Sequence, residues 1–177
     1  MPPYLAIPHF HLSKLPATTK VALTGFSLAL LTGILFVAFA VFKERTGYKV
    51  RNVQANFAGD ERVGRETGQK VEAMYAEHNE RSINDIVHPH SFMIPLIYFV
   101  LCHLMEMSYG PKAFKMTVYI VAFVGMMGVI FSPLLVWSNI SLAGVVIPAV
   151  VGMLGCFVVM ILVPTWQMWF GGARTAP

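Results

Sequence analysis

The stretch INDIVHPHSFMIPLIYFVLCHLMEMSYGPK, residues 83–112, combines a membrane-like apolar run with three histidines and a glutamate. His88 and His90 stand where the apolar run begins, and His103 and Glu106 lie inside it. Such a run predicts a helix that crosses the bilayer, whose core of ~30 Å needs roughly 20 apolar residues. Ionisable side chains are costly in hydrocarbon, so the same segment also indicates where the function lies.

The composition of the whole chain also indicates a membrane protein. Of its 177 residues, 56% are hydrophobic and only 12% are charged, well below the roughly 25% that is usual in a soluble domain. Three further apolar runs cover 21–42, 114–137 and 142–164. Lipid cannot hydrogen-bond to backbone amides, and the period-two alternation of barrel strands is missing. We therefore expect an all-α fold, an integral membrane four-helix bundle.

The predicted segments follow from these runs. In the loop between the first two spans, residues 71, 74, 75 and 78 repeat at helical spacing, which predicts a short amphipathic helix over 69–81. The other half of that loop, 47–68, is interrupted by glycines. In chain order we expect an inner-face segment (1–20), a first span (21–42), an extracytoplasmic loop of about 45 residues (43–90), a second span (91–109), a third span (114–137), a fourth span (142–164) and an inner-face tail (165–177).

The basic residues predict the orientation of the spans. With four crossings, five bases in the short loops and termini fall on one side, namely Lys14, Lys20, Lys112, Lys115 and Arg174. Positive residues prefer the cytoplasmic side, so both termini are expected to be cytoplasmic. The first span is too long for the apolar core of a cleaved signal peptide, and we expect it to remain as an anchor.

Small residues in the last two spans predict how the helices pack. Glycine lets membrane helices approach closely because no side chain separates their backbones. We therefore expect a compact bundle whose close contacts involve Gly125, Gly128, Gly144, Gly152 and Gly155.

Several functional classes are disfavoured by the sequence. No C-x-x-C-H motif is present, so covalently attached haem is not expected. No nucleophile–base pair or metal-hydrolase spacing indicates independent catalysis. Cys102 and Cys156 lie inside apolar runs and are expected to be packing residues. The basic pI of about 9.2 reflects the inner-face lysines rather than nucleic-acid binding.

The depth and helical phase of the histidines restrict which of them act together. His88 and His103 are fifteen residues apart, hence about 22 Å along a helix axis, and differ by only ~60° in direction. His90 and His103 differ by ~220° and do not share a face. His78 also belongs to the outer set, whereas His9 and His11 are on the inner side with His103.

Two kinds of role are open for these residues. Imidazole suits iron, copper and zinc, so the candidate metal ligands are His88, His90 and His103. His103 is equally a candidate hydrogen-bond partner of a quinone or part of a proton relay, with Glu106 beside it at i+3 to bond it or accept a proton. The simpler alternatives are headgroup contacts outside and polar helix–helix hydrogen bonds inside.

The first, third and fourth spans contain no histidine, so one chain cannot build two transmembrane bis-histidine haem sites. A methionine, another subunit or the inner-segment histidines would have to supply the opposite iron ligand. The candidate methionines are Met116, Met126, Met127, Met153 and Met160.

From residue 83 to about 169, the pattern VHPHSF followed by MIPLIYFVLCHL resembles a family of bacterial four-helix membrane proteins. The second helix of that family opens with an H-x-H-x-F motif, and its members accompany multihaem cytochromes and other respiratory electron-transfer components. The resemblance implies His88, His90 and Phe92 as motif positions. It also implies the bacterial inner membrane as location and other membrane subunits of an electron-transfer complex as partners, without naming a reaction.

The functional expectation is an accessory integral membrane subunit of a bacterial energy-transducing electron-transfer complex. Histidines of the second span would hold or border a haem b or a quinone, with Glu106 beside them. Two alternatives remain open at this point. One is a cofactor-free structural or assembly subunit of a larger membrane complex, and the other is a pigment-associated subunit in which a histidine ligates the magnesium of a chlorophyll.

Overall fold

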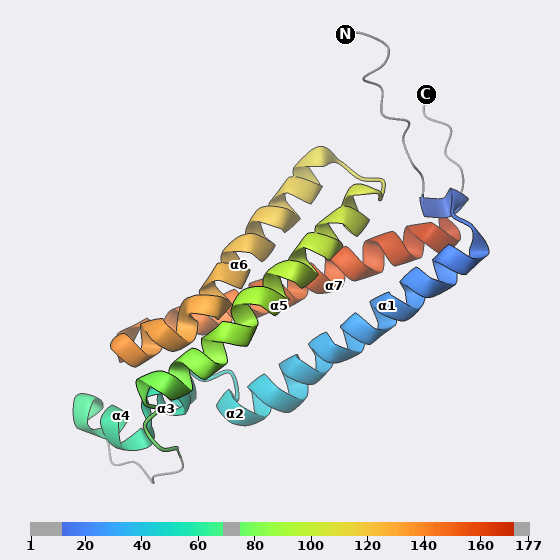
Figure 1. Cartoon of the computed structure of the whole chain (residues 1–177). Helices are drawn as coiled ribbons and strands as arrows, with labels where there is room; N and C mark the ends of the chain where they lie inside the picture. Colours follow the sequence, from blue (N-terminus) through green and yellow to red (C-terminus); the bar gives the residue numbers. More distant parts are fainter. Residues whose placement is uncertain (1–11, 69–74, 172–177) are drawn as a thin grey trace.

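The computed structural model describes residues 12–68 and 75–171, which form helices and, within these two ranges, no strand (Figure 1). Four helices in this part of the chain are long and apolar enough to cross a membrane. They are Ala17–Thr46, Glu80–Glu106, Lys112–Ser138 and Ile140–Phe170. The expected all-α fold with four candidate spans is thereby confirmed.

The four long helices run alternately from one end of the molecule to the other (Figure 1). The first long helix combines α1, the π-helical segment η3 and the short α2, whereas the last is entered through the 3-10 turn η4. Their bounds are η2 Leu12–Lys14, α1 Ala17–Leu35, η3 Phe36–Lys43, α2 Glu44–Thr46, α3 Val50–Ala58, α4 Asp60–Thr67, α5 Glu80–Glu106, α6 Lys112–Ser138, η4 Ile140–Val145 and α7 Val146–Phe170.

The tightest helix pair is α6 and α7, which meet at two glycines. A Cβ added to Gly125 would lie 2.8 Å from both the carbonyl oxygen of Ala149 and the amide nitrogen of Met153. A Cβ added to Gly128 would lie 2.7 Å from the Cβ of Ala149. The expected close approach is confirmed at these two positions, because any side chain would hold the helices apart.

The other three glycines of these spans do not mark close helix contacts. A Cβ at Gly152 would reach the Val121 side chain at an ordinary 3.7 Å, and at Gly144 and Gly155 it would meet nothing within 4 Å. A small residue permits a close approach without requiring one.

The helices α5 and α1 both rest on α7 but are not packed along each other. α5 contacts α6 and α7 through fully buried residues such as Leu101 and Met105. α1 contacts chiefly α7 and buries only Ser27 and Ile34. Figure 1 shows the two helices apart from one another. Much of each helix therefore faces away from the rest of the described chain.

The polar end of the molecule is closed by α3 and α4, which lie in the glycine-interrupted part of the chain. Gly47, Gly59 and Gly68 end successive helices with φ of 54°, 81° and 70°, values that glycine adopts without steric cost. Two side chains fasten this cap to the α6–η4 corner. Gln54 Nε2 donates to the Ile140 carbonyl (3.0 Å), and an Arg62 guanidinium nitrogen donates to the Trp137 carbonyl (2.7 Å).

The short helix predicted over 69–81 is not formed at residues 75–79, whereas residues 80 and 81 belong to the start of α5. Residues 69–74 lie outside the described part. The backbone of Tyr75 is instead paired with Asp60: its N–H donates to Asp60 Oδ2 (2.7 Å), and its carbonyl accepts the Asp60 N–H (3.0 Å). The next helix starts after Asn79, whose Oδ1 accepts the Ser82 N–H (2.8 Å) as an N-cap.

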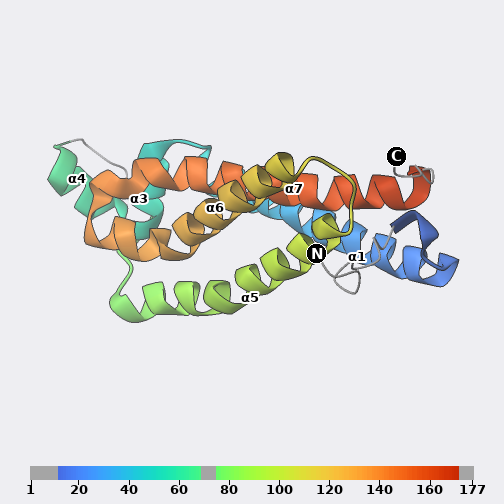
Figure 2. The ribbon, with the colours of Figure 1, turned by 90° about the horizontal axis from the view of Figure 1, so that it is seen from above.

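α5 begins at Glu80, so residues 80–90 of the predicted loop are helical. It contains Pro89 and Pro95, each of which removes one backbone hydrogen bond and bends the helix. Figure 2 shows the N-terminal half of α5 standing apart from α6 and α7. His9 and His11 lie outside the described residues, so their predicted position stays a prediction.

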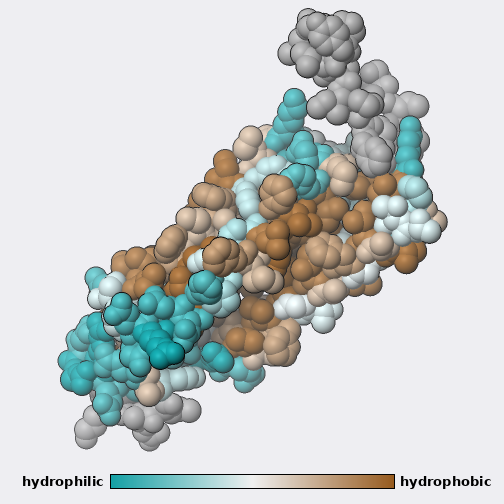
Figure 3. All heavy atoms as spheres, in the orientation of Figure 1, coloured by the Kyte–Doolittle hydropathy of each residue, from teal (hydrophilic) through white to brown (hydrophobic). Residues whose placement is uncertain are grey.

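Hydrophilic and hydrophobic side chains occupy different parts of the surface along the long axis of the molecule. Figure 3 shows hydrophilic residues over α3 and α4 and again near the opposite end, with hydrophobic surface between them. This is the distribution expected of helices that cross lipid and end in water.

Candidate functional site

The outward face of α5 contains most of the predicted site residues. Steps of four, four, three, four and three residues place them on one helical stripe. Phe92, Leu96 and Phe99 on this stripe are 66%, 58% and 59% exposed, so no described part of the chain covers it. The members of the stripe are His88, Phe92, Leu96, Phe99, His103 and Glu106.

His103 is held in one tautomer and one orientation by its own helix. Its Nδ1–H donates to the Phe99 carbonyl (2.9 Å), and its ring packs on the Phe99 ring with 4.2 Å between centroids. The ring is exposed, and no described residue bonds to its Nε2. A histidine that donates from one ring nitrogen to a backbone carbonyl presents the lone pair of the other nitrogen, which is the arrangement of metal-ligating histidines.

The outer histidines face different directions. His88 lies on the outward stripe, exposed, with its ring edge-on to Phe92 at 5.3 Å. His90 donates from Nδ1 to the Ile86 carbonyl (2.6 Å). It is eleven residues from buried Leu101, hence within about 20° of the direction in which α5 packs. His90 is nevertheless exposed.

Glu106 is bound by α6 rather than by His103. Its Oε2 accepts the Tyr119 hydroxyl (3.1 Å) and lies 3.8 Å from Lys115 Nζ, which also donates to the Glu106 carbonyl (2.8 Å). No hydrogen bond joins His103 to Glu106 within residues 75–171, so the first of the two expected roles of Glu106 is not seen, and proton acceptance stays a prediction. The helix places them one turn apart, but the stronger partners come from the neighbouring helix.

Tyr119 and Lys115 are the site residues that sequence reasoning missed. They are four residues apart on α6, hence on one face, and the turn between α5 and α6 is only five residues long. That spacing brings the first turn of α6 back beside the last turn of α5. The short turn and the four-residue spacing could therefore have indicated Lys115 and Tyr119 from the sequence.

The described residues do not complete an iron site by themselves. No group of three or more His, Cys, Asp or Glu side chains in the described ranges could hold a metal. His88 is about 22 Å from His103 along the helix, too far to share one iron. Of the candidate methionines, Met126, Met153 and Met160 are buried, whereas Met116 and Met127 are exposed on α6. His9 and His11, the other candidates on this chain for a second ligand, lie outside the described residues.

Comparison with known proteins supplies a family and nothing finer. Neither the curated proteins nor the solved structures give a match. Residues 47–175 match the model of a family described as a transmembrane helical domain, Aq_1264_TM. The matched region covers α3 to α7 and leaves out α1, the helix that packs chiefly on α7. With most of its length matched, the chain belongs to the Aq_1264_TM family of transmembrane helical domains.

Proposed function

We propose that this protein is an accessory membrane subunit of a bacterial energy-transducing electron-transfer complex, and that the outward face of α5 binds a haem b shared with another subunit. The observation that supports the proposal is His103. Its ring lies in a candidate span on a face that the described chain leaves uncovered, with Nδ1 bonded and with no partner for Nε2 among the described residues. Ionisable groups in spans normally face protein or a polar cavity, so a partner is needed to cover it.

The tautomer favours a metal over an oxidised quinone. Because Nδ1 donates to a carbonyl, Nε2 of neutral His103 is an acceptor with a lone pair. A quinone carbonyl is also an acceptor and cannot bond to it, whereas the iron of a haem takes such a lone pair. Chlorophyll magnesium would accept it too, which leaves the identity of the tetrapyrrole to experiment.

The roles within the chain follow from depth and direction. His103 is the ligand of this haem, at the inner level. His88, on the same stripe about 22 Å away, cannot reach the same iron and would hold a second haem at the outer level. His90 borders that level from the other side of α5. Glu106, held by Tyr119 and Lys115, is the acidic group nearest the inner site and the place where a proton would be held. The haem would supply one-electron chemistry, and these residues would hold and orient it.

The visible spectrum tests this function. The protein is purified through a tag on this chain, with its native partners, in a mild detergent. We expect a Soret band and α and β bands that sharpen on reduction with dithionite. Far-red absorption instead would identify the pigment-associated alternative. A folded, colourless complex would contradict the haem proposal and favour the structural subunit.

We also propose that both termini are cytoplasmic, on the strength of the basic residues at the η2 and α5–α6 ends. Alkaline phosphatase, which is active only outside the cytoplasm, is fused after Thr67 in one fusion protein and after Gly110 in another. High activity is expected at Thr67 and background activity at Gly110. The reverse pattern would invert the topology, and with it the levels given to His88 and His103.

A further inference from the structure

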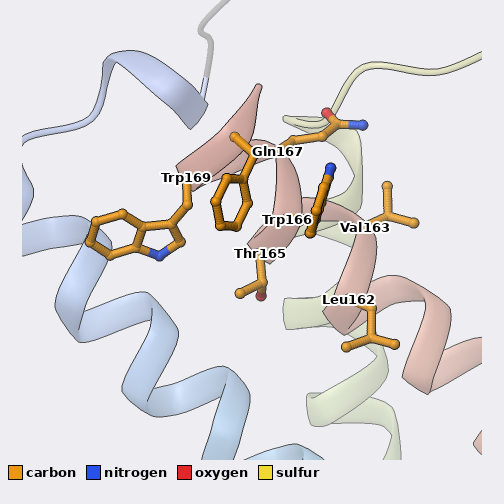
Figure 4. Close-up of a pocket in the computed structure, with 7 residues that line it drawn as sticks. Leu162, Val163, Thr165, Trp166, Gln167 and Trp169 are labelled. Atoms are coloured by element: carbon orange, nitrogen blue, oxygen red, sulfur yellow. The ribbon is translucent and has the colours of Figure 1, made fainter. Parts of the chain in front are cut away.

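An open pocket of about 610 Å³ lies at the C-terminal end of α7 (Figure 4). Its volume falls within the roughly 300–1,000 Å³ of small-molecule sites. All its lining residues come from α7, and the pocket faces the space that α1 and α5 leave between them. It belongs neither to the outward stripe of α5 nor to the Glu106 cluster.

The walls of this pocket are fixed by contacts on both sides. Trp169 points toward α1, where its Nε1–H donates to Thr24 Oγ1 (2.9 Å) (Figure 4). Gln167 points toward the α5–α6 turn and binds the Tyr109 backbone twice, accepting its N–H and donating to its carbonyl (2.8 Å). The pocket is therefore preformed and does not need a ligand to order it.

The surface that remains open in the pocket is aromatic. Trp166 and Phe170 are 65% and 69% exposed, and their ring centroids lie 4.4 Å apart. With Leu162 they offer contact area for hydrocarbon chains. Two tryptophans and a phenylalanine at one end of a spanning helix also mark the interface depth, where lipid headgroups begin.

The charge beside the pocket is positive. Lys20 Nζ stands 5.7 Å from the centre of the Trp169 ring and donates to the Ser13 carbonyl (2.9 Å). It forms no ion pair with any residue of the described ranges. Residues 1–43 contain no acid, and the one acid beyond residue 85, Glu106, is engaged by α6. An anion near Lys20 would therefore be attracted by the ammonium group and would meet no acidic side chain from the described part of α1 or α7.

We propose that this pocket binds one anionic phospholipid, with its phosphate at Lys20 and its acyl chains along α7 between α1 and α5. The apolar lining requires hydrocarbon, which a free phosphate ion lacks. The unpaired ammonium prefers a headgroup without its own cation, such as phosphatidylglycerol, over phosphatidylcholine. The lipid would join α1, which lies outside the matched family region, to the remainder of the bundle. This inference is independent of the haem.

Tryptophan fluorescence offers a direct test, because the chain has only three tryptophans. Trp137 lies at the C-terminal end of α6 and does not line the pocket. The Trp137→Phe variant therefore keeps only Trp166 and Trp169, both of which line it, as fluorescence reporters. The variant is reconstituted in phosphatidylcholine vesicles containing increasing fractions of brominated lipid, which quenches fluorescence on contact. Half-maximal quenching is expected at an about fivefold lower fraction of brominated phosphatidylglycerol than of brominated phosphatidylcholine.

Substitutions of Lys20 test whether its ammonium group causes the preference for phosphatidylglycerol. Lys20→Gln should bring the two lipids to equal potency, and Lys20→Arg should retain the preference. Lys43→Gln, which removes one charge from the far end of the same helix, is the matched control and should also retain it. Equal quenching by both lipids in the parent would overturn the proposal, as would an unchanged preference in Lys20→Gln. Loss of the preference on adding millimolar inorganic phosphate would identify a site for soluble anions and overturn it too.

Discussion

Replacing Gly125 by leucine is expected to lower the free energy of unfolding by about 3 kcal/mol, the upper end of the usual cost of overpacking. Overpacking is milder where side chains can rotate away. Here the first obstacles are the carbonyl oxygen of Ala149 and the amide nitrogen of Met153, each 2.8 Å from the position of a new Cβ. Backbone atoms of α7 cannot yield without moving the helix, so α6 and α7 must separate along a buried contact.

A matched control lies on α7. Gly155→Leu adds the same side chain at a position where nothing lies within 4 Å, and it should change the free energy of unfolding by no more than about 0.5 kcal/mol. Unfolding of each variant in mixed micelles with increasing denaturing detergent, followed by circular dichroism, gives the comparison. Equal stability of the two variants would mean that α6 and α7 do not meet at Gly125 in the membrane.

Replacing His103 by alanine is expected to remove the inner haem, with occupancy falling at least tenfold. Loss of a residue that merely orients a ligand typically costs about 10–100-fold in metal affinity, and His103 is proposed as the ligand itself. The reduced α band and the haem content per complex, measured on the purified assembly, report this loss. His78→Ala, the same substitution outside the outward stripe of α5, should leave both unchanged.

Chemical rescue separates ligation from structure. In His103→Gly, added imidazole can occupy the vacated space, and a restored α band would show that the ring nitrogen is what the iron requires. A merely structural histidine would not be replaced in this way. If His103→Ala retained its full haem content, band positions and midpoint potential, His103 would not be a ligand. The haem, if present, would then have to be assigned to other subunits.

The polar end shows where sequence patterns were insufficient. The segment 47–68 contains glycines that usually interrupt helices, yet it forms α3 and α4. Gly47, Gly59 and Gly68 each fall just after a helix end with positive φ, and Gly64 is accommodated inside α4. The helical spacing across 71, 74, 75 and 78 was a weaker signal than it looked. The Tyr75 backbone bonds to Asp60, fifteen residues away, and that contact cannot be inferred from periodicity.

The candidate site shows the same limit. Helical phase predicts that His88 and His103 share a broad face and that His90 does not, because phase depends only on spacing within one helix, and all three do lie in the single helix α5. The partner of Glu106 was missed, because Tyr119 and Lys115 come from α6 and their reach depends on how α5 and α6 are set against each other. Ligation by any of the histidines stays a prediction.

The sequence by itself determined that this chain has four helices able to cross a membrane, where each lies approximately, and which of them contains the imidazoles. Hydropathy, length and helical phase are local properties, and lipid leaves the backbone little choice but the helix. Only the tertiary structure decided that the histidine stripe of α5 faces away from the other helices and that Gly125 rather than Gly155 is a helix contact. It also decided that α1 and α5 do not pack along each other and that residues of α7 form an aromatic pocket. These outcomes depend on which helix faces pack together, and packing is settled by shape complementarity between residues far apart in the chain.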